Sequence, residues 1–262
     1  MSNFSNFMLN FHILTLFPDI FSGFLTESIL YRAKEQGLIS VHLYSLRDWG
    51  IGPHKQVDDS PYGGGTGMVL MAPVVVRAIR EITKEWDRAK SRIVLLTPQG
   101  KVFNEPKAKD LTKYENVLFI CGRYEGFDER IRDFVDEELS IGDFILNGGE
   151  VAAMAVVEAV FRLIPGVLTK EEATEIESFT DGLLEYPQYT RPEEFMEKKV
   201  PGVLLSGHHA NIEKWREEKS LEKTKEKRPD LLESGDNLKG PMNHLKHGGA
   251  THHSTHGKEG EC

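Results

Sequence analysis

Cysteine is scarce in this chain of 262 residues, which holds only Cys121 and Cys262. Two cysteines exclude a disulfide scaffold and every zinc or iron–sulfur site that is built from several cysteines. The chain also lacks an apolar run near the ~18 residues that a membrane-spanning helix needs. No positive charge precedes its first apolar stretch, as a secretory signal would require. These absences predict a cytoplasmic protein with no membrane span.

The chain also lacks an excess of positive charge. The chain has 32 basic and 41 acidic residues and a net charge of −9, which argues against a nucleic-acid binder that is basic all over. The charge is unevenly spread, however. Residues 125–150 hold nine acids and two arginines, a local −7, whereas residues 198–228 hold nine Lys or Arg and five Glu, a local +4. The opposite fields suggest two domains with different partners.

What is present is the pattern of a globular α/β protein. Short apolar runs rich in β-forming residues predict strands at 12–17, 40–45, 92–97, 117–121 and 139–146. Apolar residues at helical spacing predict helices at 19–36, 73–86 and 151–163. Strands that alternate with helices predict a mostly parallel sheet with helices on both faces.

The composition also predicts how the chain is divided. Residues 1–10 are a polar and aromatic N-terminal extension without periodicity, and residues 11–167 hold the α/β pattern. Residues 168–185 carry six acids and no clean period, so they are predicted to be an inter-domain linker. Residues 186–233 are predicted to form a small helical domain, and residues 234–262 a disordered tail rich in Gly and His.

Four glycine-bearing segments are candidates for ligand binding: SPYGGGTGM (60–68), LTPQGK (96–101), GRYEGFDER (122–130) and SIGDFILNGGE (140–150). The last three follow or contain a predicted strand, and ligands of open α/β sheets bind where loops leave the carboxyl ends of strands. None of the four has the spacing of a P-loop or of a dinucleotide fingerprint. One such turn is most often only a turn, but three at three strand ends predict a binding site.

Together with three other motifs, these segments resemble a known family. The motifs are PYGGG, PQG, CGRYEG-x-DER, SIGD-x-x-L-x-GGE, R-x-IPGVL, GLLE-x-PQYTRP and VLLSG-x-H-x-x-I-x-x-WR. In this order they resemble the bacterial tRNA (guanine-N1)-methyltransferases, which methylate the guanine just 3′ of the anticodon. The resemblance runs from about Phe11 to Leu232 without large gaps.

The resemblance implies a fold that the residues alone would not suggest. The family belongs to the knotted SPOUT methyltransferases, in which a trefoil knot at the end of the α/β domain holds S-adenosyl-L-methionine in a bent shape. Chain connections are normally unthreaded, so the knot is expected from the resemblance only. The resemblance also implies a homodimer in which one subunit's cofactor pocket lies beside the other's C-terminal domain, so that the subunits share each active site around a tRNA substrate.

The resemblance further implies a set of cofactor-binding residues: Leu95, Leu96, Thr97, Pro98, Gly122, Tyr124, Glu125, Ile141, Gly142, Asp143, Phe144, Ile145, Leu146, Gly148 and Gly149. Backbone groups at Gly122 and at residues 141–146 would read the adenine edge, and Leu96, Ile141 and Leu146 would enclose its ring. The local charge of −7 suits a cationic methyl donor. Family members also need Mg²⁺, for which Glu125 is the candidate neighbour.

For catalysis, the resemblance implies a general base in the linker and an arginine on the preceding helix. The base removes the proton from guanine N1, and the arginine stabilises the charge that develops on O6. Arg162 matches the arginine, and Glu177 stands where the family has Asp, so the carboxylate is one methylene longer. Glu175 and Asp181 are the alternative bases.

Two further departures from the family pattern lie in parts that would face tRNA. Thr66 replaces a usual Pro, and His208 replaces a usual Asn.

Two other hypotheses about the function stay open. One is a knotted RNA methyltransferase that acts on ribose hydroxyls, against which the linker carboxylate and Arg162 argue. The other is a cofactor- or RNA-binding module that has lost catalysis.

Overall fold

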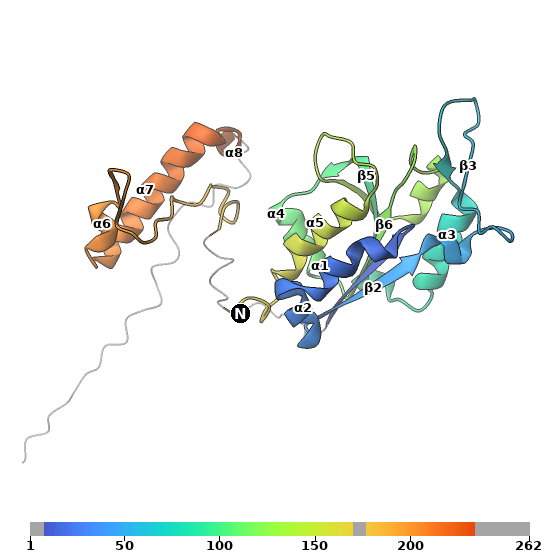
Figure 1. Cartoon of the computed structure of the whole chain (residues 1–262), viewed down its shortest axis with the longest axis horizontal. Helices are drawn as coiled ribbons and strands as arrows, with labels where there is room; N and C mark the ends of the chain where they lie inside the picture. The colour runs from blue at the N-terminus through green and yellow to red at the C-terminus, as the bar shows by residue number, and fades with distance from the viewer. Residues whose placement is uncertain (1–7, 170–176, 234–262) are drawn as a thin grey trace, which may run out of the picture. The chain divides into compact units, whose positions relative to one another are not determined.

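A parallel sheet of five strands forms the centre of the first of two units in this computed structural model, which describes residues 8–169 and 177–233 (Figure 1). The strand order is β2 (Ile39–Ser45), β1 (Leu9–Thr15), β6 (Asn116–Cys121), β5 (Ser91–Val102) and β7 (Glu137–Ser140), and each neighbouring pair is parallel. The predicted mixed α/β fold with a parallel sheet is confirmed.

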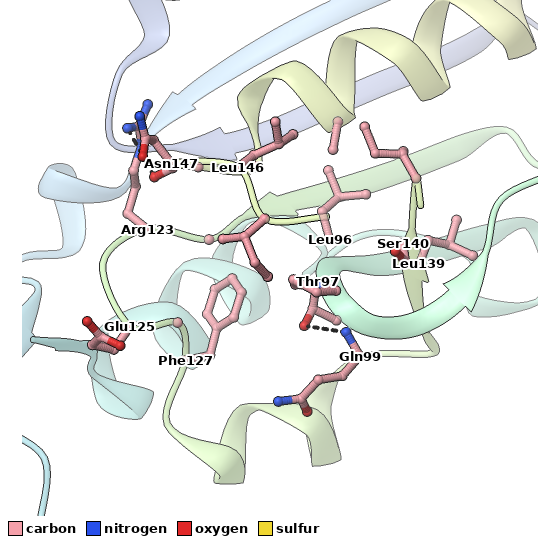
Figure 2. A pocket seen from close by; sticks show the side chains of 18 of the residues that line it. Leu96, Thr97, Gln99, Arg123, Glu125, Phe127, Leu139, Ser140, Leu146 and Asn147 are labelled. Atoms are coloured by element: carbon pink, nitrogen blue, oxygen red, sulfur yellow. Dashed lines mark hydrogen bonds between the residues drawn. The ribbon is translucent and has the colours of Figure 1, made fainter. Parts of the chain in front are cut away.

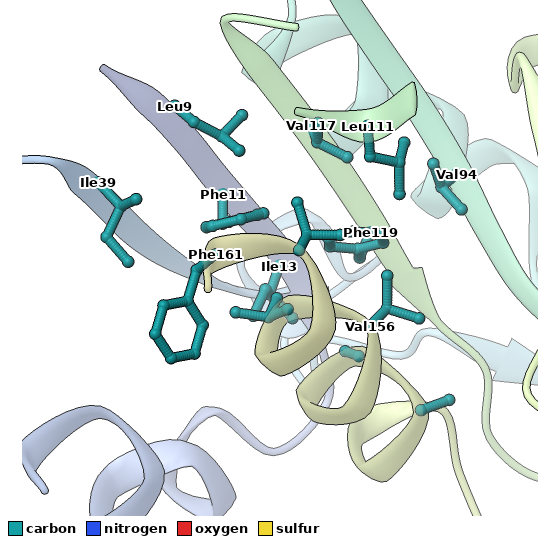
Figure 3. Packing of buried hydrophobic residues seen from close by; sticks show 14 of the residues in the cluster. Leu9, Phe11, Ile13, Ile39, Val94, Leu111, Val117, Phe119, Val156 and Phe161 are labelled. Atoms are coloured by element: carbon teal, nitrogen blue, oxygen red, sulfur yellow. The ribbon is translucent and has the colours of Figure 1, made fainter. Parts of the chain in front are cut away.

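Helices cover both faces of the sheet because side chains alternate between the faces along each strand. Phe11 and Ile13 of β1 pack with α1 (Ser22–Thr26), α2 (Ser28–Glu35), α4 (Glu105–Leu111) and α5 (Glu150–Phe161). Figure 3 shows Val156 and Phe161 of α5 beside the strand side chains of this cluster. Leu14 of β1 belongs to the opposite cluster, with α3 (Ala72–Ile82) and the short helices η2 (Leu46–Trp49) and η4 (Glu129–Phe134).

The pairing of β5 with β7 is interrupted at the edge that carries the site. Leu96 pairs with Leu139, and so does Lys101, so that residues 97–100 leave the ladder as a loop. The strand predicted at 139–146 ends at Ser140, and that prediction is wrong beyond this residue. Residues 141–149 instead return to the end of β6, where the Gly149 amide donates to the Gly122 carbonyl over 2.9 Å.

The predicted helix at 19–36 is broken into η1 (Pro18–Phe21), α1 and α2. The break lies at Ser28, whose φ of 63° is incompatible with a continuous right-handed helix. Leu9 and Asn10, within the predicted extension, lie in β1, and Leu9 is buried in the core. Short elements complete the first unit: β3 (Asp58–Asp59) pairs with β4 (Val69–Leu70), and η3 (Arg88–Lys90) precedes β5.

Contacts divide the chain into Met1–Glu175 and Ile176–Cys262. The second unit holds a hairpin of β8 (Glu194–Phe195) and β9 (Lys198–Lys199), followed by α6 (Gly202–Leu205), α7 (His209–Lys227) and α8 (Asp230–Glu233). Leu184 lies against α7, where its amide donates to the buried Thr224 hydroxyl over 2.9 Å. The second half of the predicted linker is thus part of this unit.

The other predictions about chain division fall outside the described residues. These are residues 1–7 of the predicted extension, residues 170–176 of the predicted linker and the predicted tail at 234–262. In the ranges that the structure describes, none of the helices has the length and the apolar character that crossing a membrane requires.

Candidate functional site

A pocket of about 570 Å³ lies where three loops leave the sheet (Figure 2). Its walls are residues 96–99 after the regular part of β5, residues 122–127 after β6, and residues 139–149 between β7 and α5. The carboxyl ends of parallel strands meet at one edge of a sheet, which is where ligands of open α/β sheets bind. The interruption of the β5–β7 ladder therefore opens a cavity at the edge where the chemistry is expected.

Thirteen of the fifteen predicted cofactor-binding residues line this pocket. The two that do not are Leu95 and Asp143. Leu95 is completely buried, and its side chain packs in the cluster on the α3 face, whereas Leu96 points to the other face and lines the pocket. Asp143 is exposed and lies outside the pocket wall.

Ten further residues line the pocket that were not among the predicted cofactor-binding residues: Gln99, Arg123, Gly126, Phe127, Glu129, Arg132, Leu139, Ser140, Asn147 and Ala152. Most of these residues lie inside or next to a glycine-bearing segment, so the positions of the segments already indicated that they are near the binding site. Arg132 lies outside these segments, on η4. Only the fold shows that it lines the pocket.

Gly149 is a glycine because the returning loop lies on the end of β6. A Cβ at this position would come 2.8 Å from the Cys121 Cα and 2.9 Å from the Gly122 amide nitrogen, both of which are backbone atoms. Such distances are shorter than real Cβ contacts, so any side chain would push the two loops apart. The close approach of these backbones defines one end of the pocket.

Arg132 ties the first loop to the third wall of the pocket. Its Nη2 donates to the Gln99 Oε1 over 2.6 Å, and its Nε donates to the Glu129 Oε2 over 2.8 Å. The same guanidinium also contacts the Glu138 carboxylate on β7. The loop at 97–100 is therefore held by a charged side chain and not by strand pairing.

Arg123 lines the pocket as well, and its charged partner Glu150 is buried next to it without lining the pocket. Glu150 is 1% exposed, and its Oε1 accepts hydrogen bonds from the Thr15 hydroxyl over 2.7 Å and from Arg123 Nε over 3.3 Å. Arg123 Nη2 lies 3.0 Å from Glu150 Oε2. In Figure 2 Arg123 lies beside Asn147, whose carbonyl accepts a hydrogen bond from Nη1 over 3.3 Å.

Cys121 ends β6 just below this pair. Burial raises the pKa of its thiol well above the usual value, and the Glu150 carboxylate raises it further. A thiol that stays protonated is a poor nucleophile. Cys121 is thus a buried core residue whose thiol stays protonated.

Glu125 borders the glycine-rich segment at 60–68. Its amide donates to the Met68 carbonyl over 3.0 Å, and its carboxylate lies so close to Gly67 that a Cβ there would be 2.7 Å from Oε1. Within residues 8–169 and 177–233, no three His, Cys, Asp or Glu side chains form a group that could hold a metal ion. Glu125 alone is therefore no prebuilt metal site.

The two predicted catalytic residues belong to different units. Arg162 is half-buried and caps the carboxyl end of α5 in the first unit. Glu177 is half-buried in the second unit, where its carbonyl accepts a hydrogen bond from the Thr180 amide over 3.3 Å. Of the alternative bases, Asp181 is exposed and Glu175 lies outside the described residues.

Comparison with known proteins decides the family. The family model described as tRNA (Guanine-1)-methyltransferase TrmD matches residues 9–234, which include most of both units and every predicted site residue. The chain belongs to the TrmD family.

Relatives in the TrmD family cover nearly the same length. The tRNA (guanine-N(1)-)-methyltransferase of Geobacter sp. (strain M21) is 54% identical over 226 residues, which are 86% of this chain and 90% of the relative. The proteins of the same name from Geobacter sulfurreducens and Shouchella clausii are 53% and 51% identical. They cover 86% and 84% of this chain, and 91% and 90% of their own length. TrmD similarity therefore extends over the pocket and the second unit alike.

Proposed function

We propose that this protein transfers a methyl group from S-adenosyl-L-methionine to N1 of the guanine 3′-adjacent to the anticodon of tRNA. The observation that carries the proposal is the pocket, because thirteen residues that the family resemblance predicted from scattered motifs line one cavity. Similarity to tRNA (guanine-N1)-methyltransferases over 86% of the chain supports the same reaction. The substrate also supports a cytoplasmic location.

The residues of the pocket suit this methyl donor. A volume of about 570 Å³ is within the usual range for pockets that hold small molecules and cofactors. Leu96, Ile141 and Leu146 offer apolar surface for a flat ring, while Glu125 supplies negative charge and Glu129 is paired with Arg132. When bound, S-adenosyl-L-methionine supplies a methyl group on a positively charged sulfur, and this positive charge favours an acidic surrounding.

In the proposed reaction, Glu177 accepts the proton from guanine N1. The N1 lone pair then forms the bond to the methyl carbon while the sulfur–carbon bond breaks and its electron pair stays on sulfur. Arg162 stabilises the negative charge that develops on guanine O6 as N1 loses its proton. Each catalytic side chain thus acts at one atom of the guanine, Glu177 at N1 and Arg162 at O6.

We propose Mg²⁺ only as a bound ion beside Glu125. A single carboxylate does not fit a dedicated metal site, because Mg²⁺ prefers six oxygen ligands in octahedral geometry. An ion held at Glu125 would take its other ligands from water and from substrate phosphates.

We also propose the knot and the shared homodimer of the family. The interrupted β5–β7 ladder and the return of residues 141–149 to the end of β6 support a knotted chain at this edge. Exposed apolar side chains support a contact with a second copy. Ile145 at the pocket is 80% exposed, and Val151 on the first turn of α5 is 55% exposed.

The experiment that tests the function is methyl transfer from labelled S-adenosyl-L-methionine to a tRNA transcript with G 3′ of the anticodon. The matched transcript carries A at the same position. We expect label in the G transcript alone, and 1-methylguanosine after digestion to nucleosides. A 2′-O-methyl nucleoside would point to the ribose-methylating alternative. No label in either transcript, from folded protein with Mg²⁺ present, would point to a module without catalysis.

A further inference from the structure

Arg123 lines the pocket and is paired with Glu150, which is buried and does not itself line the pocket. No step of the proposed reaction uses this pair. Arg123 and the adjoining Gly148 and Gly149 line the cavity. Glu150 is almost fully buried, and burying an ionised carboxylate is costly unless a partner compensates it. The cost suggests that the pair does something that two apolar side chains would not do.

The pair occupies the space that a side chain at residue 148 would need. A Cβ on Gly148 would lie 2.3 Å from Arg123 Nε and 2.5 Å from Glu150 Oε2, so any larger residue would displace the pair. The face of Arg123 lies over the Phe17 ring, with Cζ 4.7 Å from the ring centre. Two segments that are distant in sequence from Arg123, residues 15–17 and 147–150, thus fix this one guanidinium.

Glu150 is the group that cancels the charge of Arg123. Among the residues that the structure describes, the other groups that the guanidinium contacts are the neutral Asn147 carbonyl and the Phe17 ring. Thr15, which also binds Glu150, is neutral as well. Without Glu150, the wall would therefore carry an uncompensated positive charge in a site partly shielded from water.

We propose that Glu150 is a specificity-determining residue, which lets the pocket accept a cationic methyl donor by neutralising Arg123. The inference rests on the proposed function, because it concerns the charge of that cofactor. S-adenosyl-L-methionine and its product S-adenosyl-L-homocysteine share most of their structure, but only the donor is positively charged at sulfur. The ratio of the affinity for the donor to the affinity for the product therefore reports the net charge of the pocket wall.

The expected size follows from Coulomb's law. A cavity of 570 Å³ is roughly 10 Å across, and a unit charge at that range changes binding by about tenfold at protein-like dielectric constants. We expect Glu150→Gln to weaken donor binding about tenfold relative to product binding. Arg123→Gln should shift the ratio the other way, and the Glu150→Gln/Arg123→Gln double variant should return it to the wild-type value.

The experiment is calorimetric titration of the full chain with S-adenosyl-L-methionine and, separately, with S-adenosyl-L-homocysteine. Glu115→Gln is the matched control, since Glu115 pairs with Lys90 at the opposite end of the strands and should leave the ratio unchanged. Thermal unfolding of each variant shows that it is folded, and Glu150→Asp keeps the charge should the Gln variant unfold. That variant should preserve the ratio even where both affinities fall.

The two proposals fail in different ways. If the wild-type protein binds neither compound, the proposed function is wrong. If the wild type binds both and Glu150→Gln and Arg123→Gln weaken both equally, the function stands and the pair is only structural. A purely structural role lowers both affinities together, and it cannot produce shifts of opposite sign in the two single variants.

Discussion

The residue with the most specific chemical task is Glu177, whose carboxylate accepts the N1 proton in the proposed reaction. We predict that Glu177→Gln lowers the rate of methyl transfer ~10²- to 10⁴-fold, because an amide is not a base at neutral pH. Binding of S-adenosyl-L-methionine should stay unchanged, since Glu177 belongs to the second unit and is not in the pocket wall. Single-turnover kinetics and direct titration measure the two effects separately.

Asp181→Asn is the matched control for this variant. Asp181 lies four residues further along the same unit and is exposed, so its loss should leave the rate near that of the wild type. Should Glu177→Gln keep full activity while Asp181→Asn or Glu175→Gln loses it, the base has been assigned to the wrong carboxylate.

His12 gives a prediction about stability. Its ring is buried between Tyr44, whose hydroxyl is 2.9 Å from Nδ1, and the Trp86 ring, with 4.5 Å between ring centres. Burial, and then the nearby His42, lowers the pKa of His12 from 6.5 to about 4. Between these two values the unfolded chain binds a proton that the folded protein does not.

The unfolding free energy should therefore fall as the pH drops from 6.5 to about 4, by on the order of 3 kcal/mol from this residue. Well above pH 6.5 the imidazole is neutral in both states and contributes no pH dependence. Urea unfolding of the wild type and of His12→Gln over this range isolates the effect, since carboxylates titrate in both proteins. Parallel curves would contradict the prediction.

At the scale of elements, the loop that returns to β6 depends on Gly149. We predict that Gly149→Ala lowers the unfolding free energy by about 1–3 kcal/mol and weakens cofactor binding, because the new Cβ meets backbone atoms that cannot rotate away. Gly202→Ala is the control, as it has open space around it and an ordinary φ. Urea unfolding and titration compare the two variants, and equal behaviour would show that the loops yield more easily than their contact suggests.

The same loop shows where sequence patterns stop being informative. The apolar run at 139–146 has the composition of a strand, yet the pairing of β7 with β5 ends at Ser140 opposite Val102, and most of the residues that follow become pocket wall. Similarly, the apolar spacing at 19–36 fits one helix, but nothing in that spacing reveals the break at Ser28. Local composition predicted the type of most elements, whereas their ends were decided by tertiary packing.

At the scale of the whole molecule, alternating strands and helices were enough to predict a parallel sheet with two covered faces. The strand order was not predictable in this way, because it depends on which strands pair at a distance in sequence. The pocket follows from that order, since β5, β6 and β7 are neighbours and end in its three walls. Family motifs located most of the wall without the order, but Arg132 and the pairing of Glu150 with Arg123 needed the fold.

The proposed shared active site makes a prediction that only an assembly of two chains can satisfy. Arg162 lies in the first unit and Glu177 in the second, so Arg162→Ala and Glu177→Gln proteins should each be nearly inactive alone. If each site combines the first unit of one subunit with the second unit of the other, a mixed dimer has one site with both defects and one intact site. Random assembly from equal amounts should then restore roughly a quarter of wild-type activity.

Co-expression of the two variants with different tags, followed by purification through both tags, isolates the mixed dimer for the methyl-transfer assay. If each subunit instead completes its own site, both sites of the mixed dimer carry one defect and no activity returns. Light scattering on the wild type provides the independent check, because a monomer cannot share a site. Recovered activity would therefore establish the dimer and the division of catalytic labour between its two units together.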